Sequence, residues 1–317
     1  MAHLLPSFTE SIDLSKLRVI NFPSLIFLCG GNIDSQSQDY NSARHFMYDY
    51  LKDHLNEIYR RIVLAETIND WYRGDLYMDL MSFEKDMAGL ASAIVLFVES
   101  PGSIAELGAF SNISEINEKL IIFISTDYYE NESFIRLGPI TYLEKSFDSV
   151  HVYPWETRKG KDKVYLKTET IKKYAFDIAD AIQEKCDIRQ KEKSFNSRNS
   201  GHIILLICDV IGIMRIVKTG EIYSFLEGLG IRIREKTLRR YLFILQKLNF
   251  IKQVAYSRDR YYISQDPKNF IRYSFTERAR TKDILRWKTD FRNWYETHDM
   301  RRIRALRSVR SEGDEAQ

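Results

Sequence analysis

Short apolar runs alternate with amphipathic segments through the first half of this 317-residue chain. The clearest run is Ile94–Val98, and residues 24–29 and Leu120–Ile124 have the same character. Sequences of this kind are typical of strands that are buried on both faces of a parallel sheet. Between them, apolar residues recur every three or four positions over 41–60 and Asp75–Ala91, which predicts helices. The alternation predicts an α/β fold with a doubly wound, flavodoxin- or Rossmann-like parallel sheet and right-handed crossovers.

Two further strands complete this prediction, one at Ile62–Ala65 and one at the sheet edge over Val150–Tyr153. Glycine-bearing loops follow the first strand, at 29–32, and the strand at 94–98, at 99–103. In doubly wound sheets, ligands bind beyond the carboxyl ends of the strands. We therefore expect both loops to meet at one ligand site.

Charge is divided unevenly along the chain. Residues 1–150 hold 11 Lys and Arg against 22 Asp and Glu, a balance of −11. Residues 151–317 hold 36 Lys and Arg against 22 Asp and Glu, a balance of +14. Basic helices are often no more than solvated faces, but an excess of this size favours contact with a nucleic acid.

The basic half has a different pattern of elements. Helices are predicted over 202–217, 219–229 and 235–248, followed by two β-rich runs, 250–256 and 260–264. Three helices and a hairpin in this order predict an α+β winged helix-turn-helix domain, whose third helix and hairpin would contact nucleic acid. The candidate nucleic-acid-binding residues are Arg234, Lys236, Arg239, Arg240, Arg258 and Arg260.

Three regions follow from these patterns. Residues 1–155 are the predicted sheet domain, and 156–200, rich in Lys, Glu, Ser and Asn, are a predicted connecting helix and linker. Residues 201–317 are the predicted winged-helix domain, with basic helices at 276–310. For those last helices we expect the tryptophans to pack inward and the arginines to meet a polyanion or a protein partner.

Composition excludes several classes of protein. The three cysteines, Cys29, Cys186 and Cys208, have no paired spacing, which indicates a reducing cytoplasm and no zinc site. The six histidines form no metal-binding pattern, and no Walker loop, HExxH or GxSxG motif is present. The longest apolar run is too short for a membrane span, and the first residues do not have the pattern of a signal peptide. We expect a cytoplasmic protein with no metal, no cofactor and no membrane contact.

The segment 94–110, IVLFVESPGSIAELGAF, holds the best candidate for chemistry. It predicts a buried strand, a loop of small residues, and a helix that starts near Ile104 with Glu106 in its first turn. A carboxylate there can attack an anomeric carbon or stabilise an oxocarbenium-like centre. However, Ser103 and Glu106 also fit a capping box, which would make Glu106 a structural residue. The residues alone leave both interpretations open.

Two loops of this chain resemble a known family. FLCGGN at the first strand and SPGSIAELGAF after the later strand resemble nucleoside 2-deoxyribosyltransferases over about residues 24–150. The resemblance implies that Glu106 is the catalytic nucleophile. The second loop also resembles the PGGxGTxxE signature of phosphoribohydrolases. Both families have an acidic residue or glycine where this chain has Ser100 and Pro101, and Glu99 is the nearest substitute.

A deoxyribosyltransferase-like domain followed by a basic winged-helix domain resembles the effectors of type II bacterial retrons. This resemblance implies a toxic N-glycosidase in anti-phage defence, held in check by a reverse transcriptase and its branched RNA–DNA hybrid. It also implies NAD as the best candidate substrate, with nicotinamide released. Since related domains complete their sites across a dimer, it implies self-association. The candidate substrate-binding residues are Gly30, Gly31, Asn32, Glu84, Glu99, Ser100, Gly102 and Ser103.

Two other functions remain open at this point. One is a deoxyribosyltransferase or hydrolase acting on free nucleosides or nucleotides, which would exchange one base for another. The other is a DNA-binding regulator without enzymatic activity, whose sheet domain senses a nucleotide.

Overall fold

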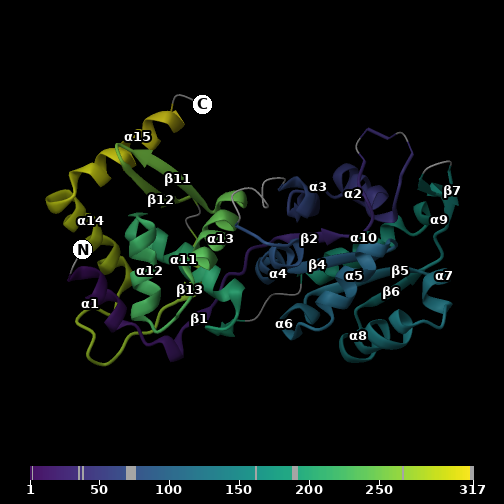
Figure 1. Cartoon of the computed structure of the whole chain (residues 1–317), viewed down its shortest axis with the longest axis horizontal. Helices are drawn as coiled ribbons and strands as arrows, with labels where there is room; N and C mark the ends of the chain where they lie inside the picture. The colour runs from purple at the N-terminus through teal and green to yellow at the C-terminus, as the bar shows by residue number, and fades with distance from the viewer. Residues whose placement is uncertain are drawn as a thin grey trace. The chain divides into compact units, whose positions relative to one another are not determined.

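The structure is a computed structural model of the chain. It describes every residue except 2, 35, 38, 69–75, 161–162, 188–191, 266–267 and 315–317, and it describes the backbone but not the side chains of 309–314. The chain forms two compact units (Figure 1). The sheet unit comprises Pro23–Trp71 and Asp79–Gln190, and the helical unit comprises Met1–Phe22, Tyr72–Met78 and Lys191–Gln317.

Five parallel strands form the sheet unit's central sheet, in the order β3-β2-β4-β5-β6. The predicted parallel sheet is therefore confirmed, with Val150–Tyr153 at its edge. The strands are β2 (Ile26–Cys29), β3 (Ile62–Val63), β4 (Ala93–Val98), β5 (Leu120–Ser125) and β6 (Val150–Tyr153).

Burial explains the positions of β4 and β5, the two longest strands of this sheet. Every residue of β4 and β5 is buried, so an apolar run without alternation is the sequence that fits. Val95 and Phe97 face one side of the sheet and pack against helices α2 and α10. On the other side, Phe27 of β2 contacts Phe110 of α5 at a ring-centroid distance of 6.5 Å. Helices thus cover both faces of the sheet.

The remaining elements of the sheet unit lie between and after the strands (Figure 1). The helix predicted over Asp75–Ala91 begins only at Leu80, where Asp79 caps it by accepting a 2.7 Å hydrogen bond from the Ser82 amide; residue 75 lies outside the described residues. The elements are α2 (Ala43–His54), α3 (Asn56–Tyr59), η2 (Ala65–Thr67), α4 (Leu80–Leu90), α5 (Pro101–Phe110), α6 (Ser114–Asn117), α7 (Thr126–Glu130), η4 (Arg136–Ile140), α8 (Thr141–Phe147), β7 (Thr157–Lys159), β8 (Val164–Leu166), α9 (Thr168–Lys172) and α10 (Ala175–Asp187).

Helix α10 belongs to the core of the sheet unit. Its residues Ile178 and Ile182 are 0% and 1% exposed and lie in the same apolar cluster as Val95 and Phe97. The polar residues around this helix favoured a connecting region over 156–200. The structure instead extends the sheet unit to residue 190.

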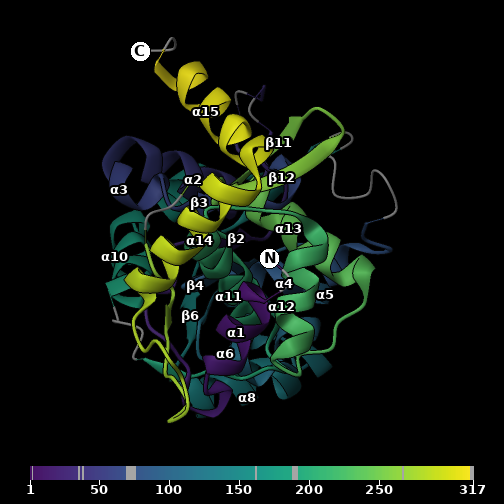
Figure 2. The ribbon, with the colours of Figure 1, turned by 90° about the vertical axis from the view of Figure 1, so that its left-hand side faces the viewer.

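The helical unit combines the first 22 residues with the C-terminal part of the chain. Helix α1 packs against α12, and a Cβ added to Gly228 would lie 2.7 Å from the Thr9 side chain (Figure 2). The elements are α1 (Leu4–Ser11), η1 (Leu14–Lys16), β1 (Arg18–Val19), β9 (Lys193–Ser194), α11 (Ser200–Met214), β10 (Ile216–Val217), α12 (Thr219–Gly228), α13 (Glu235–Lys247), β11 (Ile251–Tyr256), β12 (Asp259–Ser264), β13 (Ile271–Arg272), α14 (Ile284–His298) and α15 (Met300–Asp314).

The predicted three helices and hairpin are present as α11, α12, α13 and the β11–β12 pair. A short strand, β10, lies between the first two helices and joins the hairpin in the order β10-β12-β11. Helix α11 is buried along nearly its whole length, as its apolar sequence requires. Among the described residues, no helix combines the length and apolar composition needed to cross a bilayer.

Packing fixes the aromatic side chains of α14. Trp287 and Phe291 are buried and contact the Phe8 ring of α1 at centroid distances of 5.1 and 5.6 Å. Trp294 is partly exposed and stacks on His298, with a 5.0 Å centroid distance and an interplanar angle of 5°. The N-terminal helix thus completes a core that the C-terminal part of the chain would otherwise leave open.

Ile178→Ala tests whether α10 belongs to the sheet unit. Because Ile178 is fully buried, we expect this change to lower the free energy of unfolding by about 2–5 kcal/mol. Phe176→Ala, on the same helix at a position that is 71% exposed, should change it by about 0.5 kcal/mol or less. Guanidinium unfolding followed by circular dichroism measures both, and equal effects would contradict the assignment.

Candidate active site

A cavity of about 340 Å³ opens in the sheet unit beside the carboxyl end of β2. Five elements supply its walls: β2, α2, η2, α4 and α5. It is lined by Leu28, Cys29, Arg44, Ala65, Glu66, Leu80, Glu84 and Glu106. Of the residues predicted from sequence, the structure brings Glu106 and Glu84 together here.

Helix α5 starts earlier than the sequence pattern indicated. Ser100 is its N-cap and accepts a 3.1 Å hydrogen bond from the Ser103 amide, while the Ser103 hydroxyl accepts one from the Ser100 amide at 2.9 Å. Pro101 then occupies the first helical position, where its fixed φ and missing N–H are tolerated. The prediction that Glu106 lies in the first turn is therefore wrong, and so is the capping box formed by Ser103 and Glu106.

Glu106 is consequently free of a capping role and lies in the second turn of α5, lining the cavity. Its Oε2 atom is buried and has no hydrogen-bond partner among the described residues. Burial is the main cause that raises the pKa of Glu106 to about 8, and the negative charge of Glu84 adds to the shift. The nearby Arg44 guanidinium opposes it.

Glu84 reaches the same cavity from α4 and is buried as well. Burial raises its pKa to about 7, against the opposing effect of Arg44. Two carboxyl groups thus share one poorly solvated space and titrate near neutral pH, which is characteristic of catalytic sites.

Arg44 is a site residue that the sequence analysis missed. Its side chain is only 6% exposed and donates hydrogen bonds to the carbonyl oxygens of Leu28, at 2.7 Å, and Gly31, at 3.1 Å. It also forms an ion pair with Glu66 at 2.8 Å. One arginine within an amphipathic helix has no distinctive local pattern. Only the fold shows that its guanidinium group donates a hydrogen bond to a carbonyl oxygen near the end of β2.

Glu99 joins the two loops that follow β2 and β4. One of its oxygens accepts hydrogen bonds from the amides of Gly31 and Arg44, both at 3.1 Å, and the other accepts a 2.6 Å bond from the Ala43 amide. Burial raises its pKa, and these three bonds oppose the shift. Glu99 therefore holds the N-terminus of α2 against the sheet and is not among the described residues that line the cavity.

The other predicted substrate-binding residues lie in these loops and likewise do not line the cavity in the described structure. Gly30 has φ +142°, and a Cβ there would lie 2.9 Å from the Phe97 Cβ. A Cβ on Gly31 would lie 2.6 Å from the Ser42 Cβ. Both glycines allow close packing of the loops. Asn32 is exposed, and Ser100 and Ser103 are engaged in the α5 cap. A Cβ added to Gly102 would lie 3.8 Å from the Ser100 Oγ, an ordinary van der Waals contact.

The predicted nucleic-acid-binding residues lie on two parts of the helical unit. On the first turns of α13 and the residue before it, Arg234, Lys236 and Arg239 are exposed, and Arg239 pairs with Glu235 at 2.6 Å. Arg240 is partly buried, with its guanidinium 4.6 Å from the Tyr77 ring centroid. Arg258 and Arg260 are exposed at the turn of the β11–β12 hairpin.

Glu106→Gln tests the raised pKa through stability. A carboxyl whose pKa is higher in the folded state than in the unfolded state loses stabilisation as pH rises between the two values, here from about 4.5 to about 8. The neutral amide removes this loss. We expect the variant to melt roughly 6–12 °C higher than the unmodified protein near pH 8, and at nearly the same temperature near pH 4.

Differential scanning calorimetry at both pH values makes this measurement. The matched control is Glu132→Gln, at an exposed loop position, which should leave the melting temperature unchanged at both. A Glu106→Gln variant without a gain near pH 8 would contradict the shifted pKa.

This chain is similar to known retron proteins. The family model described as "STM3845 retron effector protein" matches residues 40–253. The chain is 34% identical over 146 residues to the Escherichia coli "Retron Ec86 putative ribosyltransferase/DNA-binding protein", an alignment that covers 46% of this chain and 45% of that protein. It is 27% identical over 162 residues to the corresponding Ec73 protein of Escherichia coli, covering 50% of each. The aligned part thus spans about half the length of each relative, whereas the family model covers most of this chain, which belongs to the STM3845 retron effector family.

Proposed function

We propose that this retron effector is a toxic N-glycosidase that cleaves the bond between base and sugar in a nucleotide. The observation that carries the proposal is the Glu106 carboxyl group, which lines a 340 Å³ cavity with one oxygen unpartnered among the described residues. A cavity at the carboxyl end of a parallel sheet is where such folds bind ligands.

The proposed reaction begins with ionised Glu106 facing the anomeric carbon. As the C1′–N bond breaks, its electron pair leaves with the base, and the carboxylate either bonds to C1′ or stabilises the oxocarbenium-like centre. Water then supplies the hydroxyl group at C1′ and gives up a proton to the carboxylate. Glu84 adds negative charge beside the cation that develops on the sugar.

NAD is the preferred substrate in this proposal. Its nicotinamide ring carries a positive charge and leaves as a neutral base, so the reaction needs little acid assistance. The same positive charge favours the ionised form of Glu106, whose pKa is raised to about 8 by burial and by Glu84. Three carboxyl groups and one guanidinium group line the cavity. This excess of acidic groups also favours a cationic ligand.

The names of the relatives favour a second candidate. Both names contain "putative ribosyltransferase", a term for transfer of a ribosyl group to an acceptor, whereas a glycosidase transfers it to water. A deoxyribosyltransferase acting on free nucleosides or nucleotides would use the same Glu106 intermediate. Base exchange after addition of a second base distinguishes transfer from hydrolysis.

For the helical unit we propose a winged helix-turn-helix that binds nucleic acid. The element order α11-β10-α12-α13-β11-β12, with β10 joining the hairpin sheet, supports this assignment. The exposed basic residues at the start of α13 and at the hairpin turn would contact phosphates. The proposed partner is the retron reverse transcriptase with its branched RNA–DNA, which restrains the glycosidase in a larger, self-associating assembly.

Glu106→Gln tests the catalytic role. We expect nicotinamide release from NAD to fall by at least about a thousandfold, because the amide can neither attack nor stabilise a cation. Binding of the reverse transcriptase–hybrid partner should persist. Mass spectrometry of released bases makes the measurement, with Glu132→Gln as the control, and unchanged release of nicotinamide would exclude the role.

The pH dependence tests the pairing of the two carboxyl groups. For the unmodified protein, kcat/KM for NAD should rise with pH to a plateau, with a midpoint near the pKa of about 8 in the free protein. Glu84→Gln removes a neighbouring negative charge that raises this pKa, so the midpoint should move to lower pH. Rate profiles of both proteins show the shift, and an unmoved midpoint would refute the coupling.

Salt dependence tests the nucleic-acid surface. Lys236→Gln removes an exposed charge at the start of α13, so binding to a branched RNA–DNA hybrid should weaken and the slope of log K against log salt should fall by about one. Lys145→Gln, an exposed change in the sheet unit, is the control and should leave the slope unchanged. Equal slopes for the unmodified protein and the two variants would exclude a contact between Lys236 and the phosphates.

A further inference from the structure

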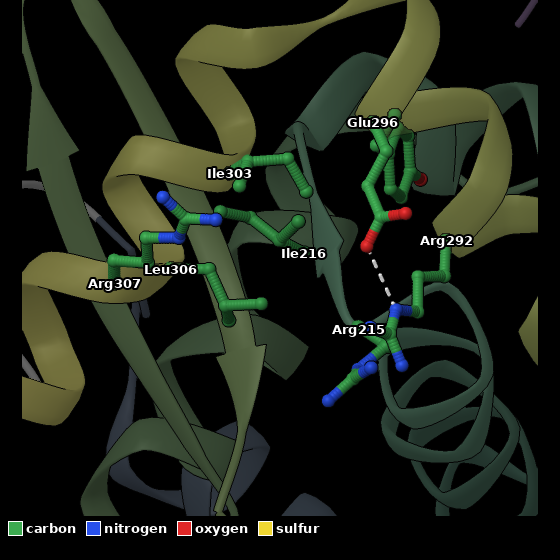
Figure 3. Close-up of a pocket in the computed structure, with 8 residues that line it drawn as sticks. Arg215, Ile216, Arg292, Glu296, Ile303, Leu306 and Arg307 are labelled. Carbon is green, nitrogen blue, oxygen red and sulfur yellow. Dashed lines mark hydrogen bonds and ion pairs between the residues drawn. The ribbon is translucent and has the colours of Figure 1, made fainter.

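A second cavity, of about 310 Å³, lies within the helical unit (Figure 3). It is enclosed by α14, α15 and the residues where α11 passes into β10. The lining residues are Arg215, Ile216, Arg292, Tyr295, Glu296, Ile303, Leu306 and Arg307. Three guanidinium groups and one carboxylate give the lining a net charge of +2.

The wall of this cavity is held by a buried arginine. Arg302 donates hydrogen bonds to the Ile216 carbonyl at 2.9 Å and to the Tyr295 hydroxyl at 3.4 Å, and both of those residues line the cavity. Arg302 also forms ion pairs with Glu221, at 2.6 Å, and with Asp299, at 3.1 Å. This network fixes α15 to β10, so the cavity is formed by packed elements.

The lining arginines come from different elements. Figure 3 shows Arg215 and Arg292 on one side and Arg307 on the other, with Ile216, Ile303 and Leu306 between them. Arg292 is ion-paired with Glu296 at 2.8 Å. Arg215 has φ +67°, an unfavourable conformation for a residue other than glycine. Strained backbone of this kind is concentrated at functional sites.

We propose that this cavity binds a nucleoside phosphate. Guanidinium groups bind phosphate oxygens through paired hydrogen bonds, and they approach this cavity from two sides. The apolar side chains between them give a base a surface on which to pack. An anion without an apolar part would leave that surface uncovered, and a hydrocarbon ligand would not complement the net positive charge of the lining.

Two kinds of ligand combine a phosphate with a base in this way. One is a free mononucleotide, and the other is one nucleotide of a single strand whose base is turned out of the stack. The inference does not rest on the proposed glycosidase, because the cavity lies in the other unit and contains none of the proposed catalytic residues.

The test measures binding of adenosine monophosphate and of a single-stranded oligothymidylate of about ten nucleotides to the full-length protein. Arg307→Glu reverses a lining charge at an exposed position of α15, and Arg304→Glu makes the same change at an exposed position outside the lining. We expect Arg307→Glu to weaken binding at least about tenfold, and Arg304→Glu by about twofold or less.

Arg215→Gly gives an independent test, because glycine accepts a positive φ. It should weaken binding while keeping or raising the melting temperature, which separates ligand binding from folding. If Arg307→Glu and Arg215→Gly bind adenosine monophosphate more weakly, the ligand of the cavity is a free mononucleotide. If they bind only the oligonucleotide more weakly, the ligand is a nucleotide of a single strand.

Equal effects of Arg307→Glu and Arg304→Glu on binding would overturn the proposal. So would the finding that neither probe binds more weakly to Arg307→Glu than to the unmodified protein. Nucleotide bound in the cavity of Glu106 would not respond to Arg307 or Arg215. The result is therefore independent of the outcome for the glycosidase.

Discussion

Two carboxyl groups that are withdrawn from water into one cavity determine the electrostatics of the sheet unit's candidate site. Glu106 and Glu84 cannot both ionise cheaply near neutral pH, because burial disfavours each charge and each charge disfavours the other. Arg44 is the nearby cation that moderates both. Its own position depends on the carbonyl groups at the end of β2 and on Glu66. The geometry of the sheet edge therefore sets the chemistry of the cavity.

The same edge shows how structural and reactive carboxylates differ. Glu99 lies only seven positions before Glu106, yet its two oxygens accept three backbone hydrogen bonds and fix the start of α2. Glu106 has an oxygen with no partner among the described residues and lies beside a cavity. Such an unpartnered group lowers stability in its charged form, and proteins retain groups of this kind at functional sites.

The sequence predicted the fold well wherever local pattern and burial agree. The strands β4 and β5 could be located because every residue in them is buried, and the β11–β12 hairpin because its turn residues interrupt two β-rich runs. The start of α5 was misplaced because two serines compete as caps, and Pro101 decides the choice. Arg44 and the core position of α10 depend on contacts between distant segments, so no local pattern reveals them.

The excess of positive charge lies in the helical unit and the excess of negative charge in the sheet unit. The helical unit carries the exposed basic residues of α13 and the hairpin, together with an arginine-lined cavity walled by the Arg302 network. The carboxyl-lined cavity of Glu106 and the exposed basic residues of α13 and the hairpin thus lie on separate units.

The chemistry proposed for the sheet unit requires that the Glu106 carboxyl group titrates near neutral pH. Carbon-13 NMR of protein labelled at the glutamate carboxyl carbon measures this directly, with the Glu106 signal assigned by its absence from the Glu106→Gln variant. We expect a midpoint near 8 for that signal. A midpoint near the ordinary value of 4.5 would show that the group is solvated and ionised at neutral pH, and would rule out the proposed burial of its charge.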